Sequence, residues 1–220
     1  MIKIALVDDH QLFRKSLSLF VASFEGVSVI FDTDDGIELT EFMDYNDVDL
    51  VLLDIQMPKM DGYEICALLK EQFKDVKILI VSQLTTKEAI HKIMELGANG
   101  FFTKNSPPEQ LELAIRSVME KDYYFDMELA SVVREAILWE RKLLTNNDYK
   151  HQVNLTSREV EIIKMACREM NSIEIGDKLC ISTRTVEKHR NRIMEKTNSK
   201  NFIGVVLFAI KSNYILIDEI

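Results

Sequence analysis

The chain has 220 residues, of which 47% are hydrophobic and 29% charged, and its formal net charge is −9. These values suit a globular protein of one large or two small domains, and no apolar run reaches the roughly 18 residues of a membrane span. The start turns acidic too early for a signal peptide, and three widely spaced cysteines form no metal pattern. We therefore expect a cytoplasmic protein.

The first half of the chain alternates buried strands with helices. The predicted strands cover 2–7, 27–31, 50–53, 77–81 and 100–103, and the predicted helices cover 10–23, 35–45, 61–72, 86–96 and 107–120. Five such units predict an α/β fold, a flavodoxin-like, doubly wound sheet of five parallel strands. Pro107 and Pro108 suit the first turn of the last helix.

Charge and composition divide the chain into parts. Residues 1–130 hold 24 acidic and 12 basic side chains, whereas residues 178–200 hold 2 acidic and 7 basic ones. The acidic part would repel nucleic acid and the basic segment would attract it. Between them, apolar residues follow a helical spacing over 126–144 before a run of turn formers. We predict an α/β domain over 1–121, a helical linker over 122–150 and a small all-α domain over 151–220.

Polar side chains stand where the predicted strands end. Asp8 and Asp9 end the first strand, Asp54 the third, Ser82 the fourth and Lys104 the fifth. The carboxyl ends of parallel strands meet at the edge where α/β sheets bind their ligands. Three clustered carboxylates repel one another unless a divalent cation joins them, and hard oxygen ligands with open water positions select Mg²⁺. The set suits the uptake of a phosphoryl group on Asp54, with Lys104 paired to a phosphoryl oxygen and Ser82 hydrogen-bonded to it.

Residues 1–121 resemble the receiver domain of two-component response regulators. The motifs that carry the resemblance are Asp8-Asp9, Asp54 with Pro58 and Gly62, Ser82, and the run from Gly97 to Lys104. The resemblance implies that a partner histidine kinase phosphorylates Asp54. It also implies that Asp9, Asp54 and the Gln56 carbonyl hold Mg²⁺, with Asp8 acting through water. Ser82 and Phe101 would be the switch pair, with Phe101 turning inward on phosphorylation.

The second half reads as helices near 157–168, 172–179, 183–196 and 202–212. Thr156 and Glu159 form a predicted capping box before the first of them. Ser182 is a predicted N-cap of the third. Two short helices joined by a tight turn are the outline of a helix-turn-helix.

The predicted helix 183–196 has two unlike faces. Val186, His189 and Ile193 share the face expected to pack. The opposite face would enter a major groove, with base contacts predicted from Lys188, Asn191 and Arg192. Phosphate contacts are predicted from Arg184, Thr185, Lys196 and Lys200.

Residues 153–212 resemble the LuxR-type helix-turn-helix of the NarL/FixJ subfamily, by Leu155–Glu161, Glu174-Ile175, Ile181-Ser182, Thr185-Val186 and His189 among others. The resemblance implies double-stranded promoter DNA as a partner, and a homodimer when phosphorylated. Glu187 stands where that family commonly has Lys; it would repel phosphate but could accept a hydrogen bond from cytosine N4.

Two other functions compete with a phosphorylation-switched transcription regulator. An aspartate-nucleophile phosphatase would need a second Asp two residues after Asp54, where this chain has Gln56; we therefore expect no enzyme. A phosphorylation-independent module could use the second half to dock protein instead of DNA. A nucleotide site is disfavoured because no Gly-rich loop follows the first strand.

Overall fold

The computed structural model describes residues 1–58, 60–84, 86–124, 153–168, 170–212 and 214–215. The chain divides into two compact units, Met1–Asp126 and Met127–Ile220. The linker helix predicted over 126–144 lies outside the described residues.

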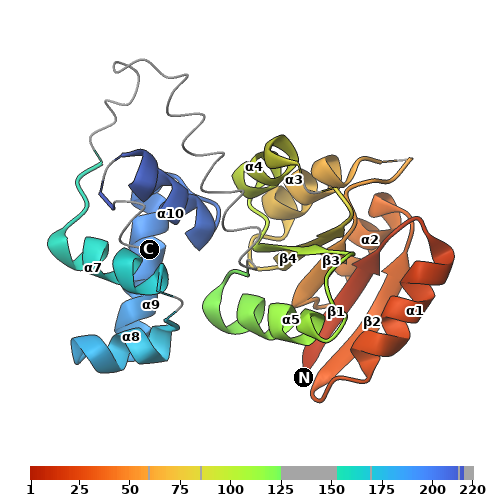
Figure 1. Ribbon diagram of the computed structural model, residues 1–220, viewed down its shortest axis with the longest axis horizontal. Helices are drawn as coiled ribbons and strands as arrows, with labels where there is room; N and C mark the ends of the chain where they lie inside the picture. The colour runs from red at the N-terminus through yellow and green to blue at the C-terminus, as the bar shows by residue number, and fades with distance from the viewer. Residues whose placement is uncertain (59, 85, 125–152, 169, 213, 216–220) are drawn as a thin grey trace. The chain divides into compact units, whose positions relative to one another are not determined.

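The first unit is built on a parallel five-stranded sheet (Figure 1). Its strands are β1 (Ile2–Val7), β2 (Val27–Thr33), β3 (Leu50–Leu53), β4 (Lys77–Ser82) and β5 (Gly100–Thr103), in the order β2-β1-β3-β4-β5. This is the flavodoxin-like order, and the fold predicted from the alternating pattern is confirmed. The order reverses between β1 and β3, so the carboxyl ends of these two strands flank the place where such sheets bind ligands.

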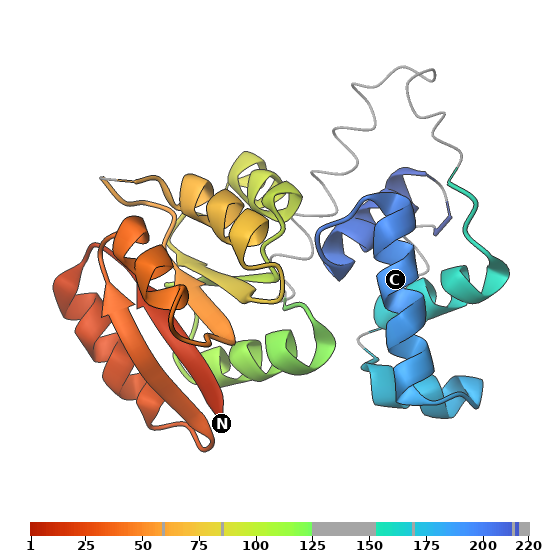
Figure 2. The same ribbon diagram turned by 180° about the vertical axis from the view of Figure 1, so that it is seen from behind.

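Helices cover both faces of the sheet, as the two opposite views show (Figures 1 and 2). They are α1 (Gln11–Ala22), α2 (Gly36–Met43), α3 (Gly62–Gln72), α4 (Lys87–Leu96) and α5 (Gln110–Lys121). One core combines alternate strand residues such as Leu6, Leu52 and Leu79 with Val21 and Ile115 of the helices α1 and α5. None of the described helices is long and apolar enough to cross a membrane.

The prediction that Pro107 and Pro108 lie in the first turn of the last helix is wrong. The helix α5 begins at Gln110. The backbone amide of Gln110 donates to the carbonyl of Pro107, and that of Leu111 to the carbonyl of Pro108, at 3.0 Å each. Each bond joins residues three positions apart, as in a turn. The two prolines thus form a turn that leads into the helix, where their missing N–H groups leave no gap in the helical hydrogen bonds.

The edge of the sheet continues past the last helix of the first unit. Tyr124 forms a parallel bridge with Gly100, and its amide donates to the carbonyl of Asn99 at 3.0 Å. Tyr124, in the segment predicted as the start of the linker, therefore pairs with the outer edge of β5.

The described part of the second unit contains four helices, α7 (Ser157–Ala166), α8 (Ser172–Leu179), α9 (Thr183–Thr197) and α10 (Phe202–Lys211). The predicted capping box of Thr156 and Glu159 is present, and the Ser182 hydroxyl caps α9 by accepting from the amide of Thr185 at 3.2 Å. The four helices share one apolar core, to which each contributes buried residues such as Ile162, Ile175, Ile193 and Val205.

Gly62 is the residue that allows α3 to start beside the end of β3. A Cβ at this position would lie 2.3 Å from the carbonyl oxygen of Asp54 and 2.5 Å from Cα of Ile55, and neither backbone atom can rotate away. Gly62 thus sets how closely α3 approaches the loop that follows Asp54.

We predict that Gly62→Ala lowers the free energy of unfolding of the first unit by about 3 kcal/mol, because the clash forces backbone apart. Gly26→Ala is the matched control: its φ is +74° but its Cβ would meet no atom within 4 Å, so it should cost about 1–2 kcal/mol. Calorimetric unfolding of both variants measures the difference. An equal loss in the two variants would contradict the steric argument.

Candidate functional site

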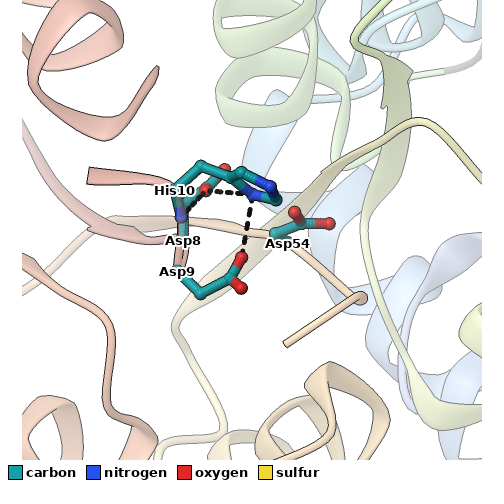
Figure 3. A group of neighbouring side chains, drawn as sticks. All are labelled: Asp8, Asp9, His10 and Asp54. Carbon is teal, nitrogen blue, oxygen red and sulfur yellow. Dashed lines mark hydrogen bonds and ion pairs between the residues drawn. The ribbon is translucent and has the colours of Figure 1, made fainter. Parts of the chain in front are cut away.

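The strand ends bring the predicted acidic side chains together (Figure 3). Val7 and Leu53 are partners in the register of β1 and β3, and the amide of Asp54 donates to the carbonyl of Val7 at 2.9 Å. This hydrogen bond extends the ladder by one residue and places Asp54 beside Asp8. The oxygens of Asp8, Asp9 and Asp54 and a ring nitrogen of His10 lie within 4.8 Å of one another.

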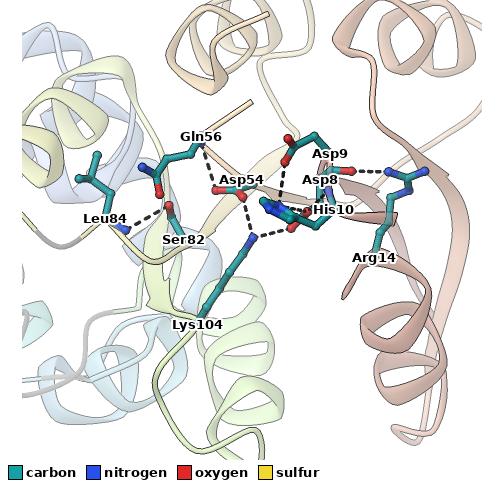
Figure 4. Close-up of polar contacts among 9 residues, drawn as sticks. All are labelled: Asp8, Asp9, His10, Arg14, Asp54, Gln56, Ser82, Leu84 and Lys104. Atoms are coloured by element: carbon teal, nitrogen blue, oxygen red, sulfur yellow. Dashed lines mark hydrogen bonds and ion pairs between the residues drawn. The ribbon is translucent and has the colours of Figure 1, made fainter. Parts of the chain in front are cut away.

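The Lys104 ammonium lies between the carboxylates of Asp8 and Asp54 (Figure 4), at 2.7 and 2.6 Å. The side chains of all three residues are at most 7% exposed. Burial alone would lower the pKa of Lys104, but the hydrogen bonds to Asp54 and Asp8 outweigh it and raise that pKa above its usual value. Lys104 is therefore a charged counterion at neutral pH.

The cluster fits a divalent cation. Three carboxylates face one ammonium, which leaves an excess of negative charge. Asp9 Oδ1 is buried and accepts no hydrogen bond from the described residues; it lies 2.9 Å from His10 Nδ1. The amide of Gln56 donates to Asp54 Oδ1 at 3.2 Å, so the peptide of Gln56 lies at the edge of the site. Such oxygen donors suit Mg²⁺.

The predicted switch residues, Ser82 at the end of β4 and Phe101 in β5, are both buried. Ser82 is fully buried, and its hydroxyl accepts a long hydrogen bond of 3.4 Å from the amide of Leu84. The amide of Lys104 donates to the carbonyl of Ser82 at 2.9 Å, so the two residues are joined through the backbone. Phe101 is 1% exposed. The predicted inward turn of Phe101 therefore has to start from a conformation other than the one described.

Arg14 belongs to the site although nothing in the sequence singled it out. Its guanidinium donates to the main-chain carbonyl of Asp8 and, at 3.0 Å, to the carboxylate of Asp32. Lys15 also holds Asp32, at 2.8 and 2.9 Å. Arg14 thus anchors the turn that carries the two acids. The partners come from different strands, so local spacing carried no signal for this pairing.

The inward face of α9 differs in part from the prediction. Val186 and Ile193 are fully buried as expected, but the third buried residue is Arg190, while His189 is half-buried. Arg190 donates to the hydroxyl of Ser172 at 3.1 Å, and its guanidinium lies 4.3 Å from the ring centre of Phe202. A buried arginine was missed because its charge suggested a solvent face.

The outward face of α9 carries the polar residues predicted to meet DNA. Among the residues predicted to contact DNA, those exposed on the helix are Arg184, Lys188, Asn191, Arg192 and Lys196, and Lys200 is exposed beyond it. Thr185 is half-buried, and its hydroxyl is 2.8 Å from that of Ser182, inside the cap of the helix.

Lys196, which was predicted to touch phosphate, is exposed on α9 and also forms an ion pair within its own unit. Its ammonium lies 2.8 and 2.7 Å from the two carboxylate oxygens of Glu159 and 3.2 Å from the carbonyl of Asn154. The Glu159 side chain is 4% exposed. Burial alone would raise the pKa of Glu159, but the hydrogen bonds from Lys196 and Thr156 lower it below its usual value.

We predict that Lys196→Met lowers the free energy of unfolding of the second unit by about 1–3 kcal/mol at pH 7, because a buried carboxylate loses a partner. The folded pKa of Glu159 is depressed, so the pairing stabilises above the unfolded value of about 4.3 and fades as pH falls through the folded value. The difference between wild type and variant should therefore vanish in acid.

Unfolding monitored by circular dichroism at pH 7 and at acid pH tests this, with Lys188→Met as control. Lys188 is exposed on the same helix and makes no ion pair in the described part of the chain. Equal stability of the two variants at pH 7 would contradict a structural role for Lys196.

Comparison with known families and proteins covers both units. Residues 4–116 match the response regulator receiver domain family, and residues 153–209 match the luxR family of bacterial regulatory proteins. The chain is 32% identical to the oxygen regulatory protein NreC of Staphylococcus epidermidis over 211 residues, which is 95% of this chain and 97% of that protein. NreC of Staphylococcus aureus is also 32% identical over 212 residues, with the same coverage of each chain.

Solved structures share the fold. The RcsB response regulator of Salmonella typhimurium aligns with a TM-score of 0.58 at 17% identity, over 94% of this chain and 98% of that chain. RcsB of Salmonella enterica bound to a promoter in the presence of a phosphomimetic aligns with a TM-score of 0.57 at 18% identity, over 96% and 98%. A LuxR-family response regulator from Aurantimonas has a TM-score of 0.58 at 25% identity, over 62% of this chain and 97% of that one.

Proposed function

The chain belongs to the LuxR family of response regulators, and from that premise we propose that Asp54 is its phosphoryl acceptor and that phosphorylation of Asp54 controls dimerisation on promoter DNA. The family assignment confirms the resemblance seen in the sequence motifs. Proteins of this family regulate transcription under the control of phosphorylation. What remains to be assigned is the role of each residue of this chain.

The observation that carries the proposal is the bridge of Lys104 between Asp8 and Asp54 at the ends of β1 and β3. A carboxylate oxygen of Asp54 would attack the phosphorus of a phosphohistidine on a partner kinase. The P–O bond forms, the P–N bond breaks, and the imidazole leaves with the bonding electron pair. Lys104 would pair with a phosphoryl oxygen once Asp54 is phosphorylated.

The acidic cluster supports a magnesium site. Asp9, Asp54 and the Gln56 carbonyl would hold Mg²⁺, with Asp8 acting through water. When bound, the ion would offset the charge of the incoming phosphoryl group. Arg14 keeps the backbone of Asp8 in place for this role.

Ser82 and Phe101 would carry the signal away from Asp54. The Ser82 hydroxyl makes one weak hydrogen bond of 3.4 Å, so little opposes its turning toward a phosphoryl oxygen. Phe101 is buried on β5 and would keep or change its conformation as Ser82 moves. A group that biases such a two-state element acts as a switch.

The exposed face of α9 would bind DNA. Lys188, Asn191 and Arg192 are proposed to reach base edges, and Arg184, Thr185 and Lys200 to reach phosphates. Lys196 is proposed to reach phosphate as well, while it also pairs with Glu159. A kinase and promoter DNA as partners also support a cytoplasmic location. The family is made up of transcription regulators, and Gln56 gives no second acid for catalytic turnover.

We predict that beryllofluoride with Mg²⁺ shifts the wild-type chain from monomer toward dimer in sedimentation velocity and tightens its binding to duplex DNA. Asp54→Asn should abolish both effects because the acceptor carboxylate is gone. Asp44→Asn, at the exposed end of α2, is the control and should respond like wild type. A full response from Asp54→Asn would refute the proposed acceptor.

We predict that Lys188→Ala weakens DNA binding and leaves the slope of log K against log salt nearly unchanged, because Lys188 is proposed to contact a base; a slope reduced by about 1 would show that it neutralises a phosphate instead. Fluorescence anisotropy between 50 and 200 mM salt, about the range over which such contacts show, measures the slope. A wild-type affinity independent of salt would favour protein docking over DNA binding.

A further inference from the structure

The direction in which α9 presents its side chains is set by contacts on its inward face. Val186 and Ile193 are fully buried in the core, and Arg190 joins the helix to Ser172 of α8 and Phe202 of α10. Lys196 adds a tie to Glu159 at the start of α7. Contacts with α7, α8 and α10 set the orientation of α9 about its axis. The same contacts therefore set which of its residues face outward.

Glu187 is an exception on that outward face. It is exposed on the first half of the helix, beside Lys188 and one turn from Arg184 and Asn191. Within the described part of the chain, Glu187 forms an ion pair with neither Lys188 nor Arg184. An acid here repels the DNA backbone and lowers general affinity for nucleic acid. An exposed carboxylate without a paired cation on the outward face of α9 is suited to accept a hydrogen bond from a donor on the DNA.

Only a few hydrogen-bond donors of the bases are exposed in the major groove. A carboxylate only accepts hydrogen bonds. Cytosine N4 and adenine N6 are the base donors exposed in this groove, but adenine N6 has acceptors on both sides, adenine N7 and thymine O4. Cytosine N4 has an acceptor on one side, guanine O6. A carboxylate therefore meets less repulsion at a C·G pair than at an A·T pair.

We propose that Glu187 determines sequence specificity by accepting a hydrogen bond from cytosine N4 at one fixed position in each half-site. Glu187 is the fifth residue of α9, which begins at Thr183, and recognition helices contact base edges with their N-terminal residues. The inference rests on the proposed binding of DNA by α9. It adds which base this chain selects and which side chain selects it.

Selection of bound sequences from a random duplex pool tests the proposal, with the full chain in beryllofluoride and Mg²⁺. The variants are Glu187→Gln and Glu187→Ala, and Glu195→Gln is the matched control, an exposed acid two turns further along the same helix. We expect the wild type and the control to enrich cytosine at one position of each half-site. Glu187→Gln should change that position to adenine, which a glutamine contacts through N6 and N7.

Glu187→Ala should accept any base at that position and leave the others unchanged. Replacing the selected C·G pair should weaken wild-type binding about tenfold and leave the Ala variant within about twofold. If Glu187→Gln keeps the wild-type preference, or if Glu187→Ala tightens binding to all sequences equally, the inference is wrong and Glu187 only repels phosphate. If the wild type retains DNA but enriches no cytosine, only this inference fails; if it retains no DNA, the proposed DNA binding fails and this inference fails with it.

Discussion

Lys104 reaches from the end of β5 across to β1 and β3 and holds Asp8 and Asp54 at 2.7 and 2.6 Å. Three carboxylates at one edge of a sheet repel one another, and burial of Asp8 and Asp54 makes that repulsion costly. The ammonium offsets part of it and leaves the remaining negative charge for a cation. The strand order brings these charges to one edge of the sheet, and Gly62 lets α3 approach the backbone of Asp54 closely.

A similar solution occurs in the second unit. Glu159 is a buried carboxylate that caps α7, and Lys196 of α9 neutralises it. In the first unit the pair of opposite charges leaves acceptor atoms ready for chemistry. In the second unit the pair is complete, since both oxygens of Glu159 bind Lys196, and its effect is to hold α9 in place. Pairs of lysine and carboxylate thus form the candidate site in the first unit and stabilise the packing of α9 in the second.

Rigidity of α9 has a consequence for recognition. Arg190, Lys196 and two aliphatic residues fix which side chains face outward, so Glu187 keeps a defined place among the cations of that face. Cations on that face supply affinity for any duplex, whereas an acid reduces it and adds preference for a base. Affinity and selectivity are therefore opposed on one helix, and pairing of two copies would restore affinity that one copy lacks.

Apolar periodicity and strand ends are local signals, so they were enough to predict the five strands, the capping box of Thr156 and Glu159, and the gathering of Asp8, Asp54 and Lys104 at one edge. The packing of distant segments established the pairing of Arg14 with Asp32, the burial of Arg190 and the ion pair of Lys196 with Glu159. Helical spacing tells which residues share a face, but not which buried partner lies opposite. A long basic side chain can reach such a partner from a position that looks exposed, so only the packed fold shows where its charge is neutralised.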